Sequence, residues 1–528
     1  MPATTRRFPH GCVASPHHLA SSAGQAVLAD GGNAVDAAVA ANLVLSVVTP
    51  YYCGVGGDLL AIVWDGRANG VTSIGRAPAG ASADAVRAAI TAGHGDASVA
   101  HPGTAGMPMF GALPVTVPGA VAGWFSLLER WGTRSFGDLV QPARRLAVDG
   151  FEVEPDVGVK VAAAARRFGE DPVWMAHYGR MRAGQRFAQP DLAATLDALA
   201  ADGPDALYRG RLAERIAGTL QARGSTMSVA DLARHEVEQA DPLRGRFRDV
   251  EVLELPPPTQ GVTALTALGV LDAVGPLPED RGLALHLQVE AVRAAMADRQ
   301  DHLADPDAMR TSSTALLARE RLSAMAAAID PVRAGVWPPA RPAPGGTAYL
   351  CAADDDGMLI SLIQSNFVGF GSGVVVPGTG IGLHDRGAHF SLDPDDPAVI
   401  APGKRPMHTL IPALALREQE PWLVFGTMGG DGQPQIHQQL LSALLDSELE
   451  LHQALEAPRF IVDVADGSVA LESRFPAAVV AGLTDRGHEV SHLDAYDDRA
   501  GHAHAIAVTR HGYAAASDPR CDGAAVGW

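Results

Sequence analysis

The stretch GGTAYLCAADDDG, residues 345–357, decides how this chain is organised. Its run from Thr347 to Ala353 is short, mostly apolar and bounded by glycines and an acidic turn, which predicts a buried strand. The preceding residues 330–346 contain five prolines, a composition typical of a linker. The chain therefore divides near Thr347 into two parts.

The two parts differ in their predicted secondary structure. Periodicity in the first part predicts a helix at 34–48 with Asn33 as its N-cap, and further helices at 119–130, 191–201, 211–222, 228–234, 263–271, 283–303 and 313–329. It also predicts strands at 59–64, 70–74 and 250–255. The second part is strand-rich, with strands at 347–353, 358–364, 410–416, 422–426, 459–462, 469–471 and 505–509 and helices at 434–445 and 476–486. This order predicts an α+β or layered α/β fold.

Composition limits the kind of function. The chain has 41 basic and 60 acidic residues and a net charge of −19. This charge argues against a nucleic-acid partner and against binding to an anionic membrane. Apolar residues make up 47% of the chain, so a large core is expected. The sequence has no apolar run long enough for a membrane span and none after the arginines near its start, so we expect no membrane partner and a cytoplasmic location.

The sequence carries no common cofactor or metal motif. The patterns GxGxxG, Walker A, HExxH and GxSxG are absent. His384, His389, His408 and His437 are not paired at i, i+4 on a predicted helix. We therefore expect neither a metal nor a cofactor.

Thr347 is the candidate nucleophile. A threonine hydroxyl is weakly nucleophilic, but at the first position of a chain its own α-amino group can accept the proton. Cleavage after Gly346 would create that amine, and glycine tolerates the strained geometry that such a cleavage needs. A Gly-Thr pair is common, however, and taken alone it indicates only a loop that enters a strand.

Motifs along the chain favour the catalytic interpretation. They are DGGNAVDAAVAANLVLSVVTP (30–50), GVGGD (54–58), PVTVPGAVAGW (114–124), LPPPTQGV (255–262), EAVRAAMADRQDHLADP (290–306), GGTAYLCAADDDG (345–357), PGKRPMHTLIPAL (402–414), GTMGGDGQP (426–434), EAPRF (456–460) and ASDPRCDGAAVG (516–527). In this order they resemble the γ-glutamyltranspeptidase family of N-terminal-nucleophile hydrolases. The string QSNFVGFGSGVVVPGTGIG (364–382) resembles the branch with cephalosporin-acylase-like and oxamate-amidohydrolase-like members.

The resemblance implies a four-layer αββα sandwich and a self-cleaving precursor. Thr347 matches the family nucleophile, so cleavage of the Gly346–Thr347 bond would leave a large chain, 1–346, and a small chain, 347–528. Gly429 and Gly430 match the pair whose N–H groups form the oxyanion hole. Ser365 occupies the place of a threonine that bonds the nucleophile. The two chains are expected to stay together as a heterodimer, which could pair into a dimer of heterodimers.

The expected substrate pocket departs from that of the glutathione-cleaving members. Arg76 is the only arginine near the place of a family arginine, which Ile74 occupies here. His408 and Thr409 replace a serine pair, and His408 could be cationic. His389 aligns with an acidic residue that grips the substrate ammonium, and Arg386 with its polar neighbour. An added guanidinium in place of an acid favours an anionic substrate group.

The resemblance therefore implies an autoprocessed amide hydrolase or acyltransferase that acts on a small molecule with a carboxylate-bearing acyl group. We expect glutaryl amides to be better substrates than γ-glutamyl amides. A true γ-glutamyl transferase or glutathione hydrolase remains an alternative. An unprocessed, inactive binding or structural protein is a second alternative. Lys404, in the PGKRP loop, is expected to hold loop carbonyls more readily than to contact substrate.

Overall fold

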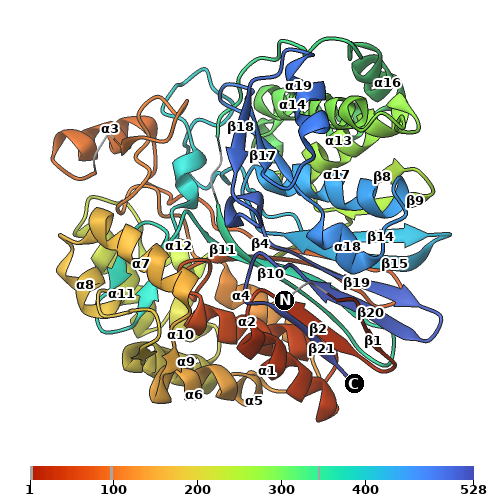
Figure 1. Ribbon diagram of the computed structural model, residues 1–528. Coiled ribbons are helices and arrows are strands. Elements are labelled where there is room, and N and C mark those ends of the chain that lie inside the picture. Colours follow the sequence, from red (N-terminus) through yellow and green to blue (C-terminus); the bar gives the residue numbers. More distant parts are fainter. Residues whose placement is uncertain (1–3, 96–98, 343–344) are drawn as a thin grey trace.

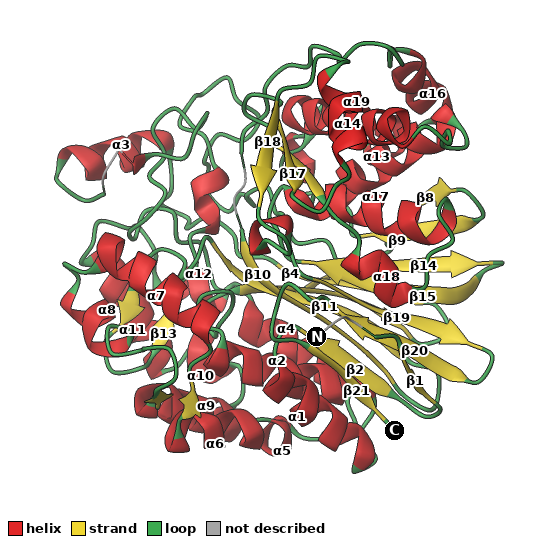
Figure 2. Ribbon diagram, in the orientation of Figure 1, coloured by secondary structure: helices red, strands yellow, loops and turns green. Residues whose placement is uncertain are grey.

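The computed structural model describes residues 4–95, 99–342 and 345–528, and it has four layers. Two seven-stranded sheets stack in the centre, and helices cover the outer face of each (Figure 1, Figure 2). This arrangement confirms the αββα sandwich. Among the described residues, no helix combines the length and apolar character that a membrane crossing needs.

Each sheet contains strands from both parts of the chain. Sheet A has the order β1 (Arg6–Phe8), β20 (Gly512–Ser517), β19 (Ala503–Thr509), β15 (Glu420–Thr427), β14 (Ala413–Arg417), β9 (Val250–Glu254) and β8 (Leu243–Phe247). Sheet B has the order β21 (Ala524–Gly527), β2 (Cys12–Ser15), β10 (Gly346–Ala353), β11 (Leu359–Phe367), β3 (Asp58–Trp64), β4 (Ala68–Ser73) and β7 (Glu238–Ala240). The first and second parts are therefore hydrogen-bonded to each other throughout.

Three large apolar clusters hold the layers together. Between the sheets, Leu60 and Tyr349 of sheet B pack with Leu414 and Ile506 of sheet A. The other two clusters join each sheet to its helices. Sheet B is covered by α1 (His18–Ala29), α2 (Ala34–Val48), α4 (Ala120–Trp131), α6 (Gln141–Asp149) and α9 (Pro190–Asp202), and sheet A by α13 (Gly261–Val274), α14 (Arg281–His302) and α17 (Gly432–Leu445).

The helix α2 confirms the prediction for 34–48. All of its residues are buried, as its apolar composition on every side requires. Asn33 is its N-cap, and the Asn33 side chain and Asp36 form a capping box. A helix without a polar face can only be stable inside the protein, and α2 accordingly lies in the apolar cluster between sheet B and its helices.

Smaller elements complete the described chain. They are α3 (Ala83–Thr91), α5 (Phe136–Leu139), β5 (Phe151–Glu152), α7 (Pro155–Phe168), α8 (Pro172–His177), β6 (Arg186–Phe187), α10 (Asp205–Tyr208), α11 (Arg211–Gln221), α12 (Val229–Ala233), α15 (Ser313–Leu316), α16 (Arg319–Ala327), β12 (Val375–Val376), β13 (Ile381–Gly382), α18 (Leu451–Glu456), β16 (Phe460–Val462), β17 (Val469–Glu472), α19 (Ala477–Thr484) and β18 (Val490–Leu493). The single helix predicted at 313–329 is wrong, because Ala318 is extended and divides it into α15 and α16.

The Pro-rich segment is anchored along its length. Glu290 of α14 accepts hydrogen bonds from the Gly335 N–H at 3.1 Å and from the Trp337 indole N–H at 2.8 Å. The Ala340 N–H donates to the Val464 carbonyl at 2.7 Å, and the Arg341 carbonyl accepts from Arg299 at 2.9 Å. These bonds hold the Pro-rich segment against α14 and the residues after β16, on the sheet A side of the sandwich, shortly before the chain enters β10.

Candidate active site

Three polar side chains form a row across sheet B. Thr347 on β10 is paired in register with Ser365 on β11, and Ser365 is paired with Asp58 on β3. Directly paired residues point to the same face of a sheet. The register shifts between Gly346 and Thr347, so the proposed cleavage site lies at an irregularity of the ladder. All three side chains are buried.

Ser365 connects the candidate nucleophile to the bond before it. The Thr347 hydroxyl donates to the Ser365 oxygen at 3.3 Å, and the Ser365 hydroxyl donates to the Gly346 carbonyl oxygen at 2.7 Å. The Phe367 N–H donates to the same Ser365 oxygen at 2.7 Å. Phe367 has a φ of 73°, unusual for a bulky residue and typical of a functional site. Ser365 is therefore placed to polarise the carbonyl of the Gly346–Thr347 bond.

Gly429 and Gly430 lie between the end of β15 and the start of α17. Their φ angles of 141° and 56° are conformations that favour glycine. A Cβ atom added to Gly345 would lie 2.7 Å from the Gly430 nitrogen. The segment before Thr347 thus rests against the two glycines, whose position at a helix N-terminus suits a developing negative charge.

Arg386 is a buried cation beside the threonine. Its guanidinium donates to the Thr409 hydroxyl at 2.9 Å and to the Ser365 hydroxyl at 3.4 Å, and it stacks 4.3 Å from the Phe367 ring centre. Among the described residues no carboxylate lies within ion-pair distance of it. Burial lowers the pKa of Arg386 to about 10, so it remains charged at neutral pH.

Asp58 is a site residue that sequence reasoning missed. Its Oδ2 accepts from His408 Nε2 at 3.1 Å, and its Oδ1 accepts from the Gly75 and Gly119 N–H groups at 3.2 Å. Burial opposes its charge, but His384 and His408 hold the pKa of Asp58 at about 2. The signal was the acid that ends the GVGGD motif. Burial and the neighbouring Arg386 lower the pKa of His408 to about 3, so this ring is neutral and not cationic.

Gln260, from the LPPPTQGV motif, is a second missed residue. Its side-chain N–H donates to the Thr409 carbonyl at 3.0 Å and to the Gly430 carbonyl at 2.8 Å. Its backbone N–H donates to the His408 carbonyl at 2.9 Å. Gln260 thus ties the proposed oxyanion loop to the loop that carries His408 and Thr409. Only the folded chain brings these segments together.

His389 lies near this group, whereas Arg76 and Lys404 bond elsewhere. The His389 ring packs 4.6 Å from Phe367, and burial together with His101 lowers its pKa well below 6.5. The Arg76 guanidinium bonds Glu238 and the Gly403 carbonyl, and it lines a separate cavity of about 400 Å³. Lys404 donates to the Pro397 and Val399 carbonyls, as expected for a loop-holding role.

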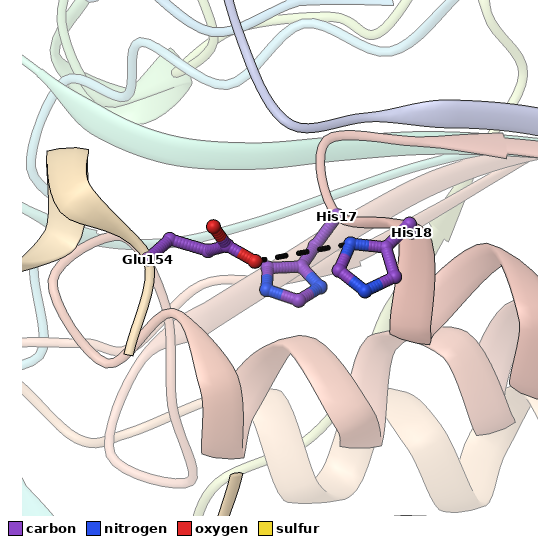
Figure 3. Close-up of side chains that lie close together, drawn as sticks. All are labelled: His17, His18 and Glu154. Carbon is purple, nitrogen blue, oxygen red and sulfur yellow. Dashed lines mark ion pairs between the residues drawn. The ribbon is translucent and has the colours of Figure 1, made fainter. Parts of the chain in front are cut away.

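Within the part of the chain that the structure describes, two groups of side chains are close enough to hold a metal ion, but the hydrogen bonds of these side chains fit a metal ion poorly. The first group is His17, His18 and Glu154 (Figure 3). There, His17 Nδ1 accepts the Leu19 N–H, so the proton of the neutral ring is on Nε2 and leaves no lone pair free. In the second, His286, Glu290 and His488, the Glu290 carboxylate already accepts from Arg293, Gly335 and Trp337. Neither group supports a metal step at the distant Thr347.

The comparisons with known proteins agree with this geometry. A family model described as Gamma-glutamyltranspeptidase matches residues 20–528. The chain is 35% identical over 537 residues to the oxamate amidohydrolase proenzyme of Klebsiella pneumoniae, with 98% of each chain covered. It is 34% identical to the acylase ACY 1 proenzyme of Pseudomonas sp. strain SE83, over 91% of this chain and 87% of that protein.

Solved structures show the same similarity. The crystal structure of cephalosporin acylase from Bacillus halodurans superposes with a TM-score of 0.91 at 34% identity, covering 99% of this chain and 97% of that one. The γ-glutamyltranspeptidase of Helicobacter pylori gives a TM-score of 0.54 at 27% identity over 60% of this chain and 91% of that chain.

Proposed function

This chain belongs to the γ-glutamyltranspeptidase family, and we propose that it is an autoprocessed amidohydrolase whose acyl substrate carries a carboxylate close to the scissile amide. The observation that carries the proposal is the buried guanidinium of Arg386. Among the described residues, the hydrogen bonds of this guanidinium go to two hydroxyl groups, those of Thr409 and Ser365. The Ser365 oxygen also accepts a hydrogen bond from Thr347. Asp58 and Asp385 favour the charge of Arg386 from outside ion-pair distance, and a desolvated cation with no carboxylate in direct contact favours binding of an anionic group.

Maturation is proposed to begin with the Thr347 hydroxyl attacking the Gly346 carbonyl carbon. The oxyanion that forms on the Gly346 oxygen would be stabilised by Ser365, which already donates to that atom at 2.7 Å. As the bond from the Gly346 carbonyl carbon to the Thr347 nitrogen breaks, this nitrogen takes up the proton that the hydroxyl has lost, and an ester remains. Water then hydrolyses the ester, so Gly346 gains a carboxylate and Thr347 a free amine.

Hydrolysis of substrate would use the new amine as general base. It takes the proton as the Thr347 oxygen attacks the amide carbonyl, and its ordinary pKa of about 8 suits this role near neutral pH. Gly429 and Gly430 are proposed to donate N–H groups to the oxyanion once the segment containing Gly345 has left them. The amine leaves with a proton, and water releases the acid from the ester.

The proximity of Arg386 to the nucleophile favours a short acyl group. Hydrogen bonds of 3.3 and 3.4 Å, joined at Ser365, connect the threonine oxygen to a guanidinium nitrogen. A carboxylate attached to the scissile carbonyl, or one carbon away, reaches both groups, whereas a glutaryl chain must fold back. We therefore propose oxamate, the substrate named for the Klebsiella relative, as the first compound to test.

A γ-glutamyl substrate is less well supported because its ammonium group needs an acid. Asp385 is buried, which raises its pKa well above 3.8 and favours the neutral acid. Asp431 pairs with Arg299, and Asp58 is engaged by His408 and two backbone N–H groups. Transfer to an acceptor amine, rather than to water, stays a prediction. So does the cytoplasmic location, which cell fractionation would test.

The test compares oxamate with oxamide, which has an amide in place of the carboxylate. Ammonia release should be much faster from oxamate. Mass analysis should find a chain of residues 347–528 with Thr347 at its N-terminus, and Thr347→Ala should remain uncut and inactive. An intact 54.8 kDa chain without activity would favour the inactive alternative. Preference for a γ-glutamyl anilide, accelerated by glycylglycine, would favour the transferase.

A further inference from the structure

We infer that Asp58 is a positioning residue for substrate specificity, which acts through the His408 ring to hold Thr409 and Arg386 as an anion subsite. Asp58 bonds His408 Nε2 at 3.1 Å, and Thr409, the next residue, accepts from Arg386 at 2.9 Å. The inference rests on the proposed function, because it assigns to Arg386 and Thr409 the carboxylate of the substrate.

The hydrogen bonds define one tautomer of His408. Its Nδ1 accepts the Leu410 N–H at 3.4 Å, so that nitrogen carries the lone pair and Nε2 carries the proton. The Nε2–H group donates to Asp58 Oδ2. The ring thus links the Asp58 carboxylate to the Leu410 N–H on the far side of Thr409, so it restrains the backbone that carries the Thr409 side chain.

Asp58 is fully buried, so its hydrogen bonds are limited to the donors that the fold places around it. Its Oδ1 faces two backbone donors, Gly75 and Gly119, whose directions are set by the backbone, and its exposed fraction is 0%. A carboxylate accepts at both oxygens, whereas an amide can accept at only one. With the carboxylate intact, the donors of Gly75, Gly119 and His408 are satisfied and His408 keeps its tautomer, whereas His384 Nε2, 4.0 Å from Oδ1, makes no hydrogen bond among the described residues.

The variant Asp58→Asn replaces the acceptor of the His408 Nε2–H group by a donor. Its carbonyl oxygen would face Gly75 and Gly119, so its NH₂ group would face the Nε2–H of His408, donor against donor. His408 must then move or change tautomer, which would oppose the Leu410 N–H. We expect KM for oxamate to rise about tenfold with kcat changed less than about twofold, as when uniform binding is lost.

A second substitution tests the route through His408. In Asp58→Asn/His408→Gln, the glutamine can present its carbonyl oxygen to the new NH₂ group, so KM should return to within about threefold of wild type. In His408→Gln alone, the amide N–H can still donate to Asp58 but the bond from Leu410 to the ring is lost, so KM should rise, though less than in Asp58→Asn. Asp65→Asn, an exposed carboxylate at the other end of the β3–β4 hairpin, is the matched control and should have no effect.

The inference fails if the double variant is as impaired as Asp58→Asn, because Asp58 would then act by charge or by folding alone. A readout without catalysis separates this result from failure of the proposed function. In uncut Thr347→Ala protein, nitrogen-15 NMR of the His408 ring should show the Nε2–H tautomer, and Asp58→Asn should change the tautomer or shift the ring signals. If wild type does not hydrolyse oxamate, the proposed substrate is wrong. His408 signals that Asp58→Asn leaves unchanged in both tautomer and chemical shift would independently overturn the role of Asp58.

Discussion

Two clusters around buried arginines differ in the hydrogen-bond partners of the guanidinium: carboxylates surround Arg520, whereas hydroxyls contact Arg386. Arg520 bonds Glu472 at 2.7 and 2.8 Å and Asp518 at 3.1 Å, and Arg459 shares Asp518. Arg386 is buried as deeply but bonds only the hydroxyls of Thr409 and Ser365 among the described residues. Arg520 belongs to a closed ion network, whereas Arg386 feels Asp58 and Asp385 only from outside ion-pair distance.

The difference has an electrostatic consequence. Burial alone would lower the pKa of Arg520, but Asp518 and Glu472 raise it above the usual value, whereas burial dominates at Arg386 and lowers its pKa to about 10. A paired buried charge supports the fold, because removing one partner leaves the other uncompensated. An unpaired one is costly unless a ligand completes it. Under the proposed function, Arg520 therefore has a structural role and Arg386 a role in binding substrate.

The largest expected effect comes from exchanging each arginine for glutamine. Arg386→Gln should lower kcat/KM for oxamate at least about a hundredfold, roughly 2.8 kcal/mol, and leave the unfolding midpoint nearly unchanged. Arg520→Gln should instead lower stability by about 3–5 kcal/mol. Parallel kinetics and urea unfolding check both. Equal loss of stability in the two variants would remove the distinction between the clusters.

Ser365→Ala tests the hydroxyl that Arg386 and Thr347 share. It removes the donor to the Gly346 carbonyl, so self-cleavage should slow about a hundredfold, the usual cost of one oxyanion donor. Gel bands followed over time after synthesis measure the rate. Ser365→Thr, which keeps the hydroxyl, is the control and should still cut. Cleavage of Ser365→Ala at the wild-type rate would mean that other donors stabilise this oxyanion.

Gly345→Ala tests the approach of the precursor segment to the oxyanion loop. The added Cβ would lie 2.7 Å from the Gly430 nitrogen, so processing should slow about tenfold while the mature site stays intact. Gly218→Ala, in α11 with no atom within 4 Å of the added Cβ, should process normally. If both variants process alike, the contact between Gly345 and Gly430 does not control maturation.

The smallest expected effect is the pH dependence of the free energy of unfolding. It arises from two buried neutral imidazoles, His408 near Arg386 and His504 near Arg459 and Asp518. Burial lowers the pKa values of His408 and His504 to about 3, below their unfolded value of about 6.5. Between these values the unfolded chain binds more protons, so stability should fall as the pH drops below 6.5 and stay level above it. Each histidine contributes at most about 1.4 kcal/mol per pH unit.

Urea unfolding of the single-chain Thr347→Ala protein at pH 7.5 and 5.5 measures this dependence. His504→Gln should reduce the loss between the two pH values, because one proton-binding site of the unfolded chain is removed. The exposed His511→Gln should not change it. A wild-type stability that is equal at both pH values would mean that these rings are not held neutral.

Much of the fold was accessible from the sequence because local signals agree with the final environment. The helix α2, the strands β3 and β10 and the Gly346–Thr347 junction follow from apolar runs and their boundaries. The terminal strands β1, β2, β20 and β21 were not predicted. The strands β1, β2 and β21 are short and pair only with strands distant in sequence, such as Cys12–Ser15 with Ala524–Gly527, whereas β20 pairs both with its neighbour β19 and with the distant β1.

By itself the sequence determined the threonine after a diglycine, the glycine pair at 429–430 and the family to which these motifs belong. Only the tertiary structure decided which charges meet them. It paired Arg76 with Glu238, left Arg386 with hydroxyl partners, and turned Asp58 toward His408. The reason is physical: a motif fixes the residues present, but burial and the partners brought by other strands fix their charge and orientation.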